Sequence, residues 1–319
     1  MPEPIPGWYT PEEIGWLRAC RLCPRECGAD RLAGEEGVCG TDAGIHISSI
    51  CIHRGEEPAI SGKHGICNIF FTGCNLQCGF CQNYQISNPR ASAEHPALSM
   101  DVVMESILRI LDRGIHGVGF VSPSHVYPQV VAILRALEKT GKKPVTVWNT
   151  NAYEHPGNIT RLEGKISVYL PDLKYVTPEL AVKYSGARDY PEVACAVVKE
   201  MYRQKGSTLQ TDKAGQAVSG LIIRHLVLPG HADESIRVLE YIATHLSARV
   251  AISLMSQYYP PGFPTGRPAP GRTLYREEYA RVVDAFYSMG FGKGWVQDLE
   301  STGYYRPDFD RGHPFETGS

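Results

Sequence analysis

Nine of the ten cysteines in this chain of 319 residues lie before residue 82. Thiols this concentrated are disulfide-bonded, bound to metal or buried, so they constrain the fold more than any other feature. The first residues, Met-Pro-Glu-Pro-Ile-Pro-Gly, contain neither the basic nor the apolar region of a secretory signal. In a long chain without a visible signal, thiolate ligation of metal is favoured over disulfides. We therefore expect a cytoplasmic metalloprotein.

Charge and hydrophobicity are those of an ordinary globular protein. The formal net charge is −2, and 21% of the residues are charged. This balance gives no electrostatic reason to expect a nucleic acid or an anionic membrane as the main partner. The longest stretch without acidic or basic residues, 114–134, contains two prolines and two histidines, so it predicts strand, loop and helix and not a membrane span.

From residue 66 onward, short apolar runs alternate with amphipathic helical patterns. Strands are expected over 66–71, 117–121, 144–148, 166–170, 221–228 and 250–254, with a hairpin at 208–217 before the fifth. Helices are expected around 99–114, 130–137, 177–186, 191–204, 236–246 and 279–286. Alternation of this kind predicts parallel strands with right-handed crossovers and an active site at the carboxyl ends of the strands.

Six such units predict an α/β protein with a partial, open (β/α)6 barrel, because a closed eight-unit barrel needs about 250 residues. We divide the chain into a cysteine-rich metal-binding unit at 1–62, the partial barrel at 63–300 and a C-terminal tail at 301–319.

The segment Phe71-Thr72-Gly73-Cys74-Asn75-Leu76-Gln77-Cys78-Gly79-Phe80-Cys81 follows the first predicted strand directly. A [4Fe–4S] cluster is normally held by four thiolates. Three closely spaced cysteines would leave one iron open to chelate a substrate. The alternative at this level is a zinc site or a set of buried thiols.

This spacing, with an aromatic residue before the third cysteine, resembles the radical S-adenosylmethionine (SAM) superfamily. Further patterns resemble its pyruvate formate-lyase activating enzyme branch, in particular the uncharacterised activating enzyme-like members, and the likeness covers roughly residues 18–295. These patterns are Cys20-Arg21-Leu22-Cys23-Pro24-Arg25-Glu26-Cys27 with Gly37-Val38-Cys39, Gly55-Glu56-Glu57-Pro58, and Cys81-Gln82-Asn83-Tyr84-Gln85-Ile86-Ser87. The resemblance implies a cluster on Cys74, Cys78 and Cys81 that cleaves SAM to a 5′-deoxyadenosyl radical. It also implies an electron donor such as flavodoxin or ferredoxin.

The resemblance also implies roles for residues at the strand ends. The cofactor-binding candidates are Phe80, Ser122, Ser124, His125, Asn149, Thr150, Asn151 and Arg224, and the catalytic candidates are Asp172 and Lys174. The family's Gly-Gly-Glu motif at the second strand is missing, and Val121-Ser122-Pro123-Ser124-His125 stands there instead. The competing interpretations are a helix-capping loop for Ser124 and structural ion pairs for the charged residues. Because burying a bare charge is costly, Arg224 needs a partner, either a cofactor carboxylate or Asp172.

A second set of four cysteines precedes the predicted barrel. Cys20, Cys23, Cys27 and Cys39 have the number and spacing to close a zinc site, a single-iron site or a second [4Fe–4S] cluster. We favour iron, because the chain already depends on cluster assembly. The remaining cysteines, Cys51, Cys67 and Cys195, lack paired spacing and are interpreted as structural thiols.

The leading hypothesis for the substrate is a protein or peptide, such as a glycyl residue of a partner enzyme, from which hydrogen is abstracted. Gln257, Tyr258 and Tyr259 end the sixth predicted strand and would line the opening to that substrate. The same radical chemistry on a small molecule is the second hypothesis. A non-enzymatic iron–sulfur or zinc binding protein is the third.

Overall fold

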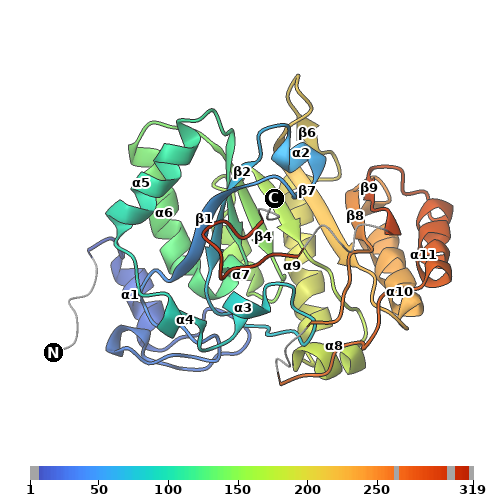
Figure 1. Cartoon of the computed structure of the whole chain (residues 1–319), viewed down its shortest axis with the longest axis horizontal. Coiled ribbons are helices and arrows are strands. Elements are labelled where there is room, and N and C mark those ends of the chain that lie inside the picture. The colour runs from blue at the N-terminus through green and yellow to red at the C-terminus, as the bar shows by residue number, and fades with distance from the viewer. Residues whose placement is uncertain (1–6, 262–265, 300–305, 316–319) are drawn as a thin grey trace.

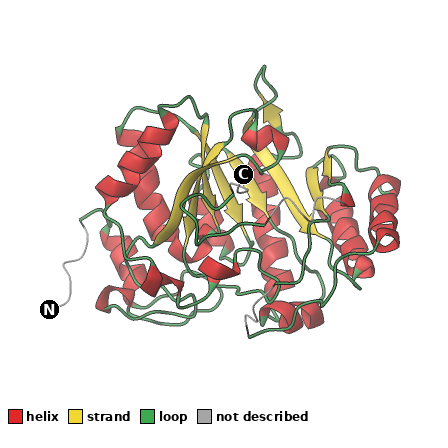
Figure 2. Cartoon of the chain, in the orientation of Figure 1, coloured by secondary structure: helices red, strands yellow, loops and turns green. Residues whose placement is uncertain are grey.

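The computed structural model describes residues 7–261, 266–299 and 306–315. The predicted tail therefore falls partly outside the described residues, which cover only 306–315 of it. The strands are β1 Ile47–His53, β2 Ile66–Phe71, β3 Gly117–Val121, β4 Val145–Thr150, β5 Val168–Pro171, β6 Gln210–Thr211, β7 Ala217–Leu226, β8 Ala251–Met255 and β9 Gly294–Val296. Together they form one α/β structure with helices outside a mostly parallel sheet (Figures 1 and 2).

The strands follow one another across the sheet in the order β1-β2-β3-β4-β5-β7-β8-β9, with β6 paired to β7. All neighbours from β2 to β9 along this path are parallel, and β1 is antiparallel to β2. The six predicted strands and their parallel pairing are thus confirmed. The predicted hairpin is confirmed by the antiparallel pairing of β6 with β7.

The longer helices are α5 Met100–Leu111, α6 Tyr127–Lys139, α8 Pro178–Ser185, α9 Tyr190–Lys205, α10 Ala232–Ile242 and α11 Arg276–Ser288. The shorter ones are α1 Pro11–Arg18, α2 Pro58–Ser61, α3 Tyr84–Ser87, α4 Ala91–Glu94 and α7 Pro156–Arg161, together with the turns η1 Arg31–Ala33, η2 Pro123–Val126 and η3 Ala243–Ser247. Among the described residues, none of the helices combines the length and apolar character needed to cross a membrane.

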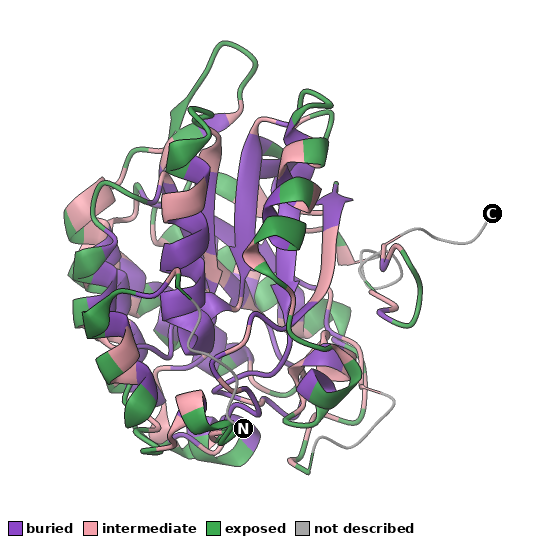
Figure 3. Ribbon diagram, turned by 90° about the vertical axis from the view of Figure 1, so that its left-hand side faces the viewer, coloured by how far each residue is buried: buried purple, intermediate pink, exposed green. Residues whose placement is uncertain are grey.

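Helix α5 illustrates how the sequence places these helices. Ser99 Oγ accepts a hydrogen bond from Val102 N at 3.4 Å, so it caps the helix as predicted. Val103, Ile107 and Leu111 recur at helical spacing and are buried together. Burial of each such side chain contributes roughly 1.5–3 kcal/mol, so this face fixes the helix against the sheet. Figure 3 shows the resulting division, with buried strands inside and exposed helix surfaces outside.

The sequence did not predict β1 or β9. Strand β1 carries two serines at its centre, and its middle residues are only half-buried, so its apolar pattern is weak. Strand β9 has only three residues, too few for any periodicity to be recognised. Because β1 runs antiparallel, the loop that follows it lies at the amino-terminal end of β2, at the opposite end of the sheet from the cysteine loop.

The described part of the C-terminal tail returns to β2. The rings of Phe309 and Phe315 each lie with their centroids 5.3 Å from that of Phe70. Gln85 accepts a hydrogen bond from Phe309 N at 3.0 Å and donates to Asp308 at 3.3 Å. The tail is thereby held beside the carboxyl end of the first parallel strand.

Candidate functional site

A cavity of about 440 Å³ lies on the inner side of the sheet and is bounded by residues from the ends of several strands. Of the predicted site residues, its wall includes Cys74, Cys78, Cys81, Phe80, Ser122, Asn149, Asn151, Asp172, Lys174 and Arg224. A volume of this size is typical of a pocket for one drug-sized ligand. The sheet therefore brings together most of the residues singled out from the sequence.

The three cysteines of the loop after β2 have sulfur atoms that each accept a hydrogen bond. Cys74 accepts from Asn151 Nδ2 at 3.5 Å. Cys78 accepts from Ser185 Oγ at 3.1 Å, and Cys81 from Ser87 Oγ at 3.3 Å. Donors of this kind are the contacts that tune cluster thiolates.

Burial raises the pKa of Cys78 to about 12, so its thiolate needs a cation to balance it. The irons of a cluster would supply that charge, and the donors around the three sulfurs fit such a group. Among the described residues, no three Cys, His, Asp or Glu side chains are placed around one point as ligands of a metal ion.

Three predicted cofactor residues lie behind the cavity wall. Ser124 Oγ and Thr150 Oγ1 are 3.0 Å apart, and Thr150 Oγ1 donates to Glu154 at 2.7 Å. His125 is buried, with Nε2 2.8 Å from the carbonyl oxygen of Thr72. Because their hydroxyl and imidazole groups bond to protein atoms, these residues support the loops of the site and do not face the cavity.

Asp172 and Lys174 form a close ion pair at the end of β5. Lys174 Nζ lies 2.6 Å from Asp172 Oδ2. The side chain of Lys174 is 16% exposed, and that of Asp172 is 25% exposed. Burial alone would lower the pKa of Lys174, but Asp172 raises it above its usual value. Lys174 is therefore a cation, and its ammonium lies 5.9 Å from the centre of the Phe80 ring.

Arg224 has different partners from those predicted. Its Nε and Nη2 donate to the two oxygens of Glu57 at 2.7 and 2.8 Å, and Nη2 also donates to Glu56. Asp172 pairs with Arg224 through a backbone bridge. The side-chain partners of the guanidinium are thus Glu56 and Glu57 in place of Asp172, which agrees with the competing interpretation of a structural ion pair. The sequence did not show these partners because the antiparallel β1, whose following loop delivers both glutamates, was not predicted.

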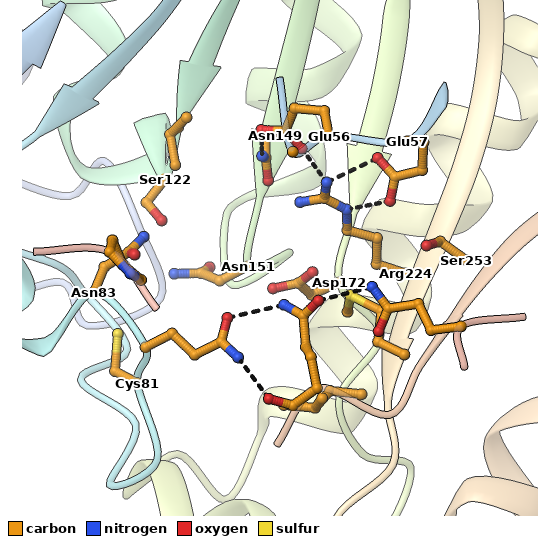
Figure 4. A pocket seen from close by; sticks show the side chains of 18 of the residues that line it. Glu56, Glu57, Cys81, Asn83, Ser122, Asn149, Asn151, Asp172, Arg224 and Ser253 are labelled. Carbon is orange, nitrogen blue, oxygen red and sulfur yellow. Dashed lines mark hydrogen bonds and ion pairs between the residues drawn. The ribbon is translucent and has the colours of Figure 1, made fainter. Parts of the chain in front are cut away.

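Several cavity residues were missed by sequence reasoning. They are His53, Glu56, Glu57, Gln82, Asn83, Ser253, Trp295 and Gln297. The pattern Gly55-Glu56-Glu57-Pro58 was used only as a mark of resemblance, since nothing local in it indicates that its glutamates border the cavity. Figure 4 shows Glu56 and Glu57 directed at Arg224, away from Cys81.

Three glutamines connect the cysteine loop to β8 and β9. Gln257 Nε2 donates to Gln82 Oε1 at 2.9 Å, and Gln297 Nε2 donates to Gln257 Oε1 at 2.7 Å. Of the three residues predicted to line the substrate opening, Gln257 borders the cavity. Tyr258 is instead buried, and its hydroxyl donates to the carbonyl of Pro270. The ring of Tyr259 is covered by Arg306.

The four N-terminal cysteines border a second, much smaller hollow. Cys20, Cys23, Cys27 and Cys39 share it with Arg25, Asn75 and His125. Beside them, Arg31 is 1% exposed, and its guanidinium donates to the carbonyls of Asp42 and His125 and to the hydroxyl of Thr41. Negative charge on Cys39, Cys20, Tyr9 or the Asp42 carboxylate would balance this cation. A buried cation beside four cysteines fits thiolates bound to metal.

The N-terminal unit also packs against the loop that carries Cys74. Arg25 donates to the carbonyls of Asn75, Leu76, Ser185 and Gly186. Cys74 N donates to Cys39 O at 3.3 Å. At Gly73, whose φ is 72°, a Cβ would lie 2.2 Å from Cys39 O, so only glycine allows this approach. The position of the loop therefore depends on the N-terminal unit.

Replacing Cys74, Cys78 and Cys81 together with Ala should leave metal on the N-terminal set. We expect about four irons and four sulfides per chain to remain, as one [4Fe–4S] cluster requires. The physical reason is that so short a segment buries too little apolar surface to order itself, so ligation must supply folding energy. Metal and sulfide analysis of the purified variant makes the measurement. Cys51→Ala, at a buried thiol outside both sets, is the control.

One zinc in that variant would contradict the preference for iron. Absence of any metal would overturn the assignment of Cys20, Cys23, Cys27 and Cys39 as ligands.

Comparison with known proteins places the chain in a family. The family model described as the Radical SAM superfamily matches residues 68–242, more than half of the chain. An uncharacterized protein of Methanocaldococcus jannaschii is 28% identical over 272 residues, which cover 84% of this chain and 74% of that protein.

Two solved structures are similar to this chain at low sequence identity. Streptococcus suis SuiB superposes with a TM-score of 0.51 at 16% identity, over 72% of this chain and 49% of SuiB. The chain thus spans about half the length of SuiB. A radical SAM methyltransferase from Sphaerobacter thermophilus gives a TM-score of 0.49 at 13% identity, over 74% of this chain and 69% of the methyltransferase. On the strength of the family match, this chain belongs to the radical SAM superfamily and is a radical SAM enzyme.

Proposed function

We propose that this enzyme cleaves SAM reductively at a [4Fe–4S] cluster held by Cys74, Cys78 and Cys81, and that the radical formed abstracts hydrogen from a protein or peptide. The observation that carries the proposal is the meeting of these three thiols with polar strand-end side chains around one cavity. The bound cluster supplies one electron to the sulfonium of SAM and an open iron for its methionine group.

The chain's own residues would bind and orient the cofactor. Asn151 Nδ2 donates both to Cys74 Sγ and to Asn75 Oδ1, which fixes its amide beside the cluster loop. Ser122 and Asn149 present polar groups at the ends of β3 and β4. Phe80 and Leu76 border the cavity with apolar surface that excludes water from the reacting bond.

We further propose that β2, β3, β4, β5, β7 and β8 form the open (β/α)6 barrel, with 1–62 as its metal-binding unit and 301–319 as its tail. The sequential, parallel order of these strands supports the proposal. The electron would come from a carrier such as flavodoxin or ferredoxin in the cytoplasm. Membership of the activating enzyme-like branch, and a glycyl residue as the target, rest on sequence resemblance.

A small-molecule substrate is the second candidate, and the tail supports it. Pro307 borders the cavity, so the described part of the tail takes up space that an entering protein loop would need. Both candidates use the same radical, and they differ only in the source of the hydrogen.

The Cys74/Cys78/Cys81 triple Ala variant should form no 5′-deoxyadenosine. The reason is that no thiolate remains to hold the cluster that carries the open iron. The measurement is chromatography of reactions with dithionite and SAM under anaerobic conditions, beside EPR spectra of the parent enzyme, which should change when SAM is added. Continued cleavage by the triple variant would refute the assignment of these ligands.

Asp172→Ala should weaken SAM binding about tenfold or more without loss of cluster iron. Removal of the carboxylate leaves Lys174 as an unpaired, largely buried cation at the cavity wall, which repels the positively charged sulfonium. Equilibrium binding of SAM and iron analysis test this, with Asp112→Asn, at an exposed surface ion pair, as the control. Binding as tight as in the parent would mean that Asp172 is purely structural.

The source of the abstracted hydrogen separates the two substrate candidates. A lysate deuterated at carbon is fractionated by size, and each fraction is incubated with enzyme, SAM and reductant. We expect deuterium in 5′-deoxyadenosine from the macromolecular fraction, measured by mass spectrometry. Deuterium from the small-molecule fraction alone would replace the peptide hypothesis with the second candidate.

A further inference from the structure

The end of the cavity opposite the cysteines is an acidic floor. Glu56 and Glu57, from the loop between β1 and α2, have side chains only 6% and 4% exposed. Both bind one guanidinium, that of Arg224, so two carboxylates share a single positive charge. Figure 4 shows this group at the far end of the cavity from Cys81, with Asp172 and Asn151 between them.

The charges around the cavity do not balance. Its acidic residues are Glu56, Glu57, Asp172 and Asp298, and its basic residues are Lys174 and Arg224. Asp172 and Lys174 neutralise each other in their own ion pair. Of the remaining excess, Asp298 carries one negative charge and the floor carries the other. At the floor, Glu56 also accepts hydrogen bonds from Asn68 Nδ2 at 2.7 Å and Asn149 Nδ2 at 3.4 Å.

Bound SAM would leave this charge unbalanced. Its methionine group would be held at the open iron of the cluster, and Cys81 lies at the other end of the cavity. The two glutamates and Arg224 would then present a net negative charge to a group that binds next to them.

His53 also borders this end of the cavity and is only 8% exposed. Burial lowers the pKa of His53, so its imidazole is neutral and does not balance the charge of the glutamates.

Aromatic residues complete the floor. Within the sheet, Arg224 pairs with Ser253, and Ser253 pairs with Trp295, so Trp295 lies level with the ion pair. Trp295 and Phe315 both border the cavity, and the Phe315 ring lies 3.9 Å from that of His53. Aromatic rings beside carboxylates are the surroundings that bind organic cations.

We propose that the floor of the cavity binds a cationic nitrogen group of the substrate, an ammonium or a guanidinium. Glu56 and Glu57 accept its hydrogen bonds. The rest of the substrate extends toward the cysteines, where its hydrogen is removed. The inference rests on the proposed hydrogen abstraction and names the chemical class of its substrate.

The test sorts the deuterated lysate by charge instead of size. Material retained on a cation exchanger, material retained on an anion exchanger and unretained material are each incubated with the loaded enzyme, SAM and reductant. We expect deuterium to reach 5′-deoxyadenosine from the cation-exchanger fraction. Filtration of that fraction by size then distinguishes a free amine from a peptide that carries a lysine or arginine side chain.

Two variants test whether the deuterium transfer depends on the glutamates of the floor. Glu57→Gln and Glu56→Gln keep the side-chain shape and remove one charge each, and each should lower deuterium transfer from the cationic fraction at least about tenfold at subsaturating concentration. Glu105→Gln, at an exposed position on α5, should transfer deuterium like the parent. Thermal melting and the EPR signal of the cluster are recorded for all three, so that a variant that does not fold is identified and the other is used.

Deuterium from the anionic or unretained fraction would overturn the inference, and so would transfer that is equal in the parent and in a folded glutamine variant. Transfer from no fraction at all would instead refute hydrogen abstraction itself, together with the inference that rests on it.

Discussion

The buried ion pair between Arg224 and the two glutamates is the interaction on which the interior depends. Arg224 lies within a parallel strand that is mostly apolar and buried, and its charge is tolerated because Glu56 and Glu57 reach it from the loop after β1. Removing one member of such a group typically costs about 3–5 kcal/mol, since the partner is left buried and charged. The pair thus joins the antiparallel edge of the sheet to β7 and closes the floor of the cavity.

A second constraint operates at the opposite end of the cavity, where the cysteine loop has little structure of its own. Its backbone is held by Arg25 from the N-terminal unit and by the contact of Gly73 with the Cys39 carbonyl. Functional residues often lie on loops that a rigid scaffold holds in position. The N-terminal cysteines and the three cysteines of the site are therefore parts of one packed arrangement, although more than 30 residues separate Cys39 from Cys74 in the sequence.

Much of this architecture was predictable because it depends on local pattern. Buried strands such as Ile66–Phe71 are continuous apolar runs, and the amphipathic helices between them show the expected period. What could not be predicted depends on long-range pairing. The weak strand β1 is defined by its partner β2, and only that pairing brings Glu56 to Arg224. For the same reason a cavity residue such as Trp295, on a strand of three residues, gave no local signal.

The loop after β3 shows how the same backbone can serve a different electrostatic design. Ser122 adopts a φ of 52°, unusual for a residue other than glycine, and this bend leaves Ser122 at the cavity while Ser124 and His125 turn behind the wall. The activating enzymes that this sequence resembles carry a glutamate in this region, whereas here a hydroxyl faces the cavity without charge. The two glutamates of this cavity lie instead on its floor, on a loop that the parallel strands do not supply. Negative charge has thus been placed deep in the cavity, where it acts on whatever binds beyond the cofactor.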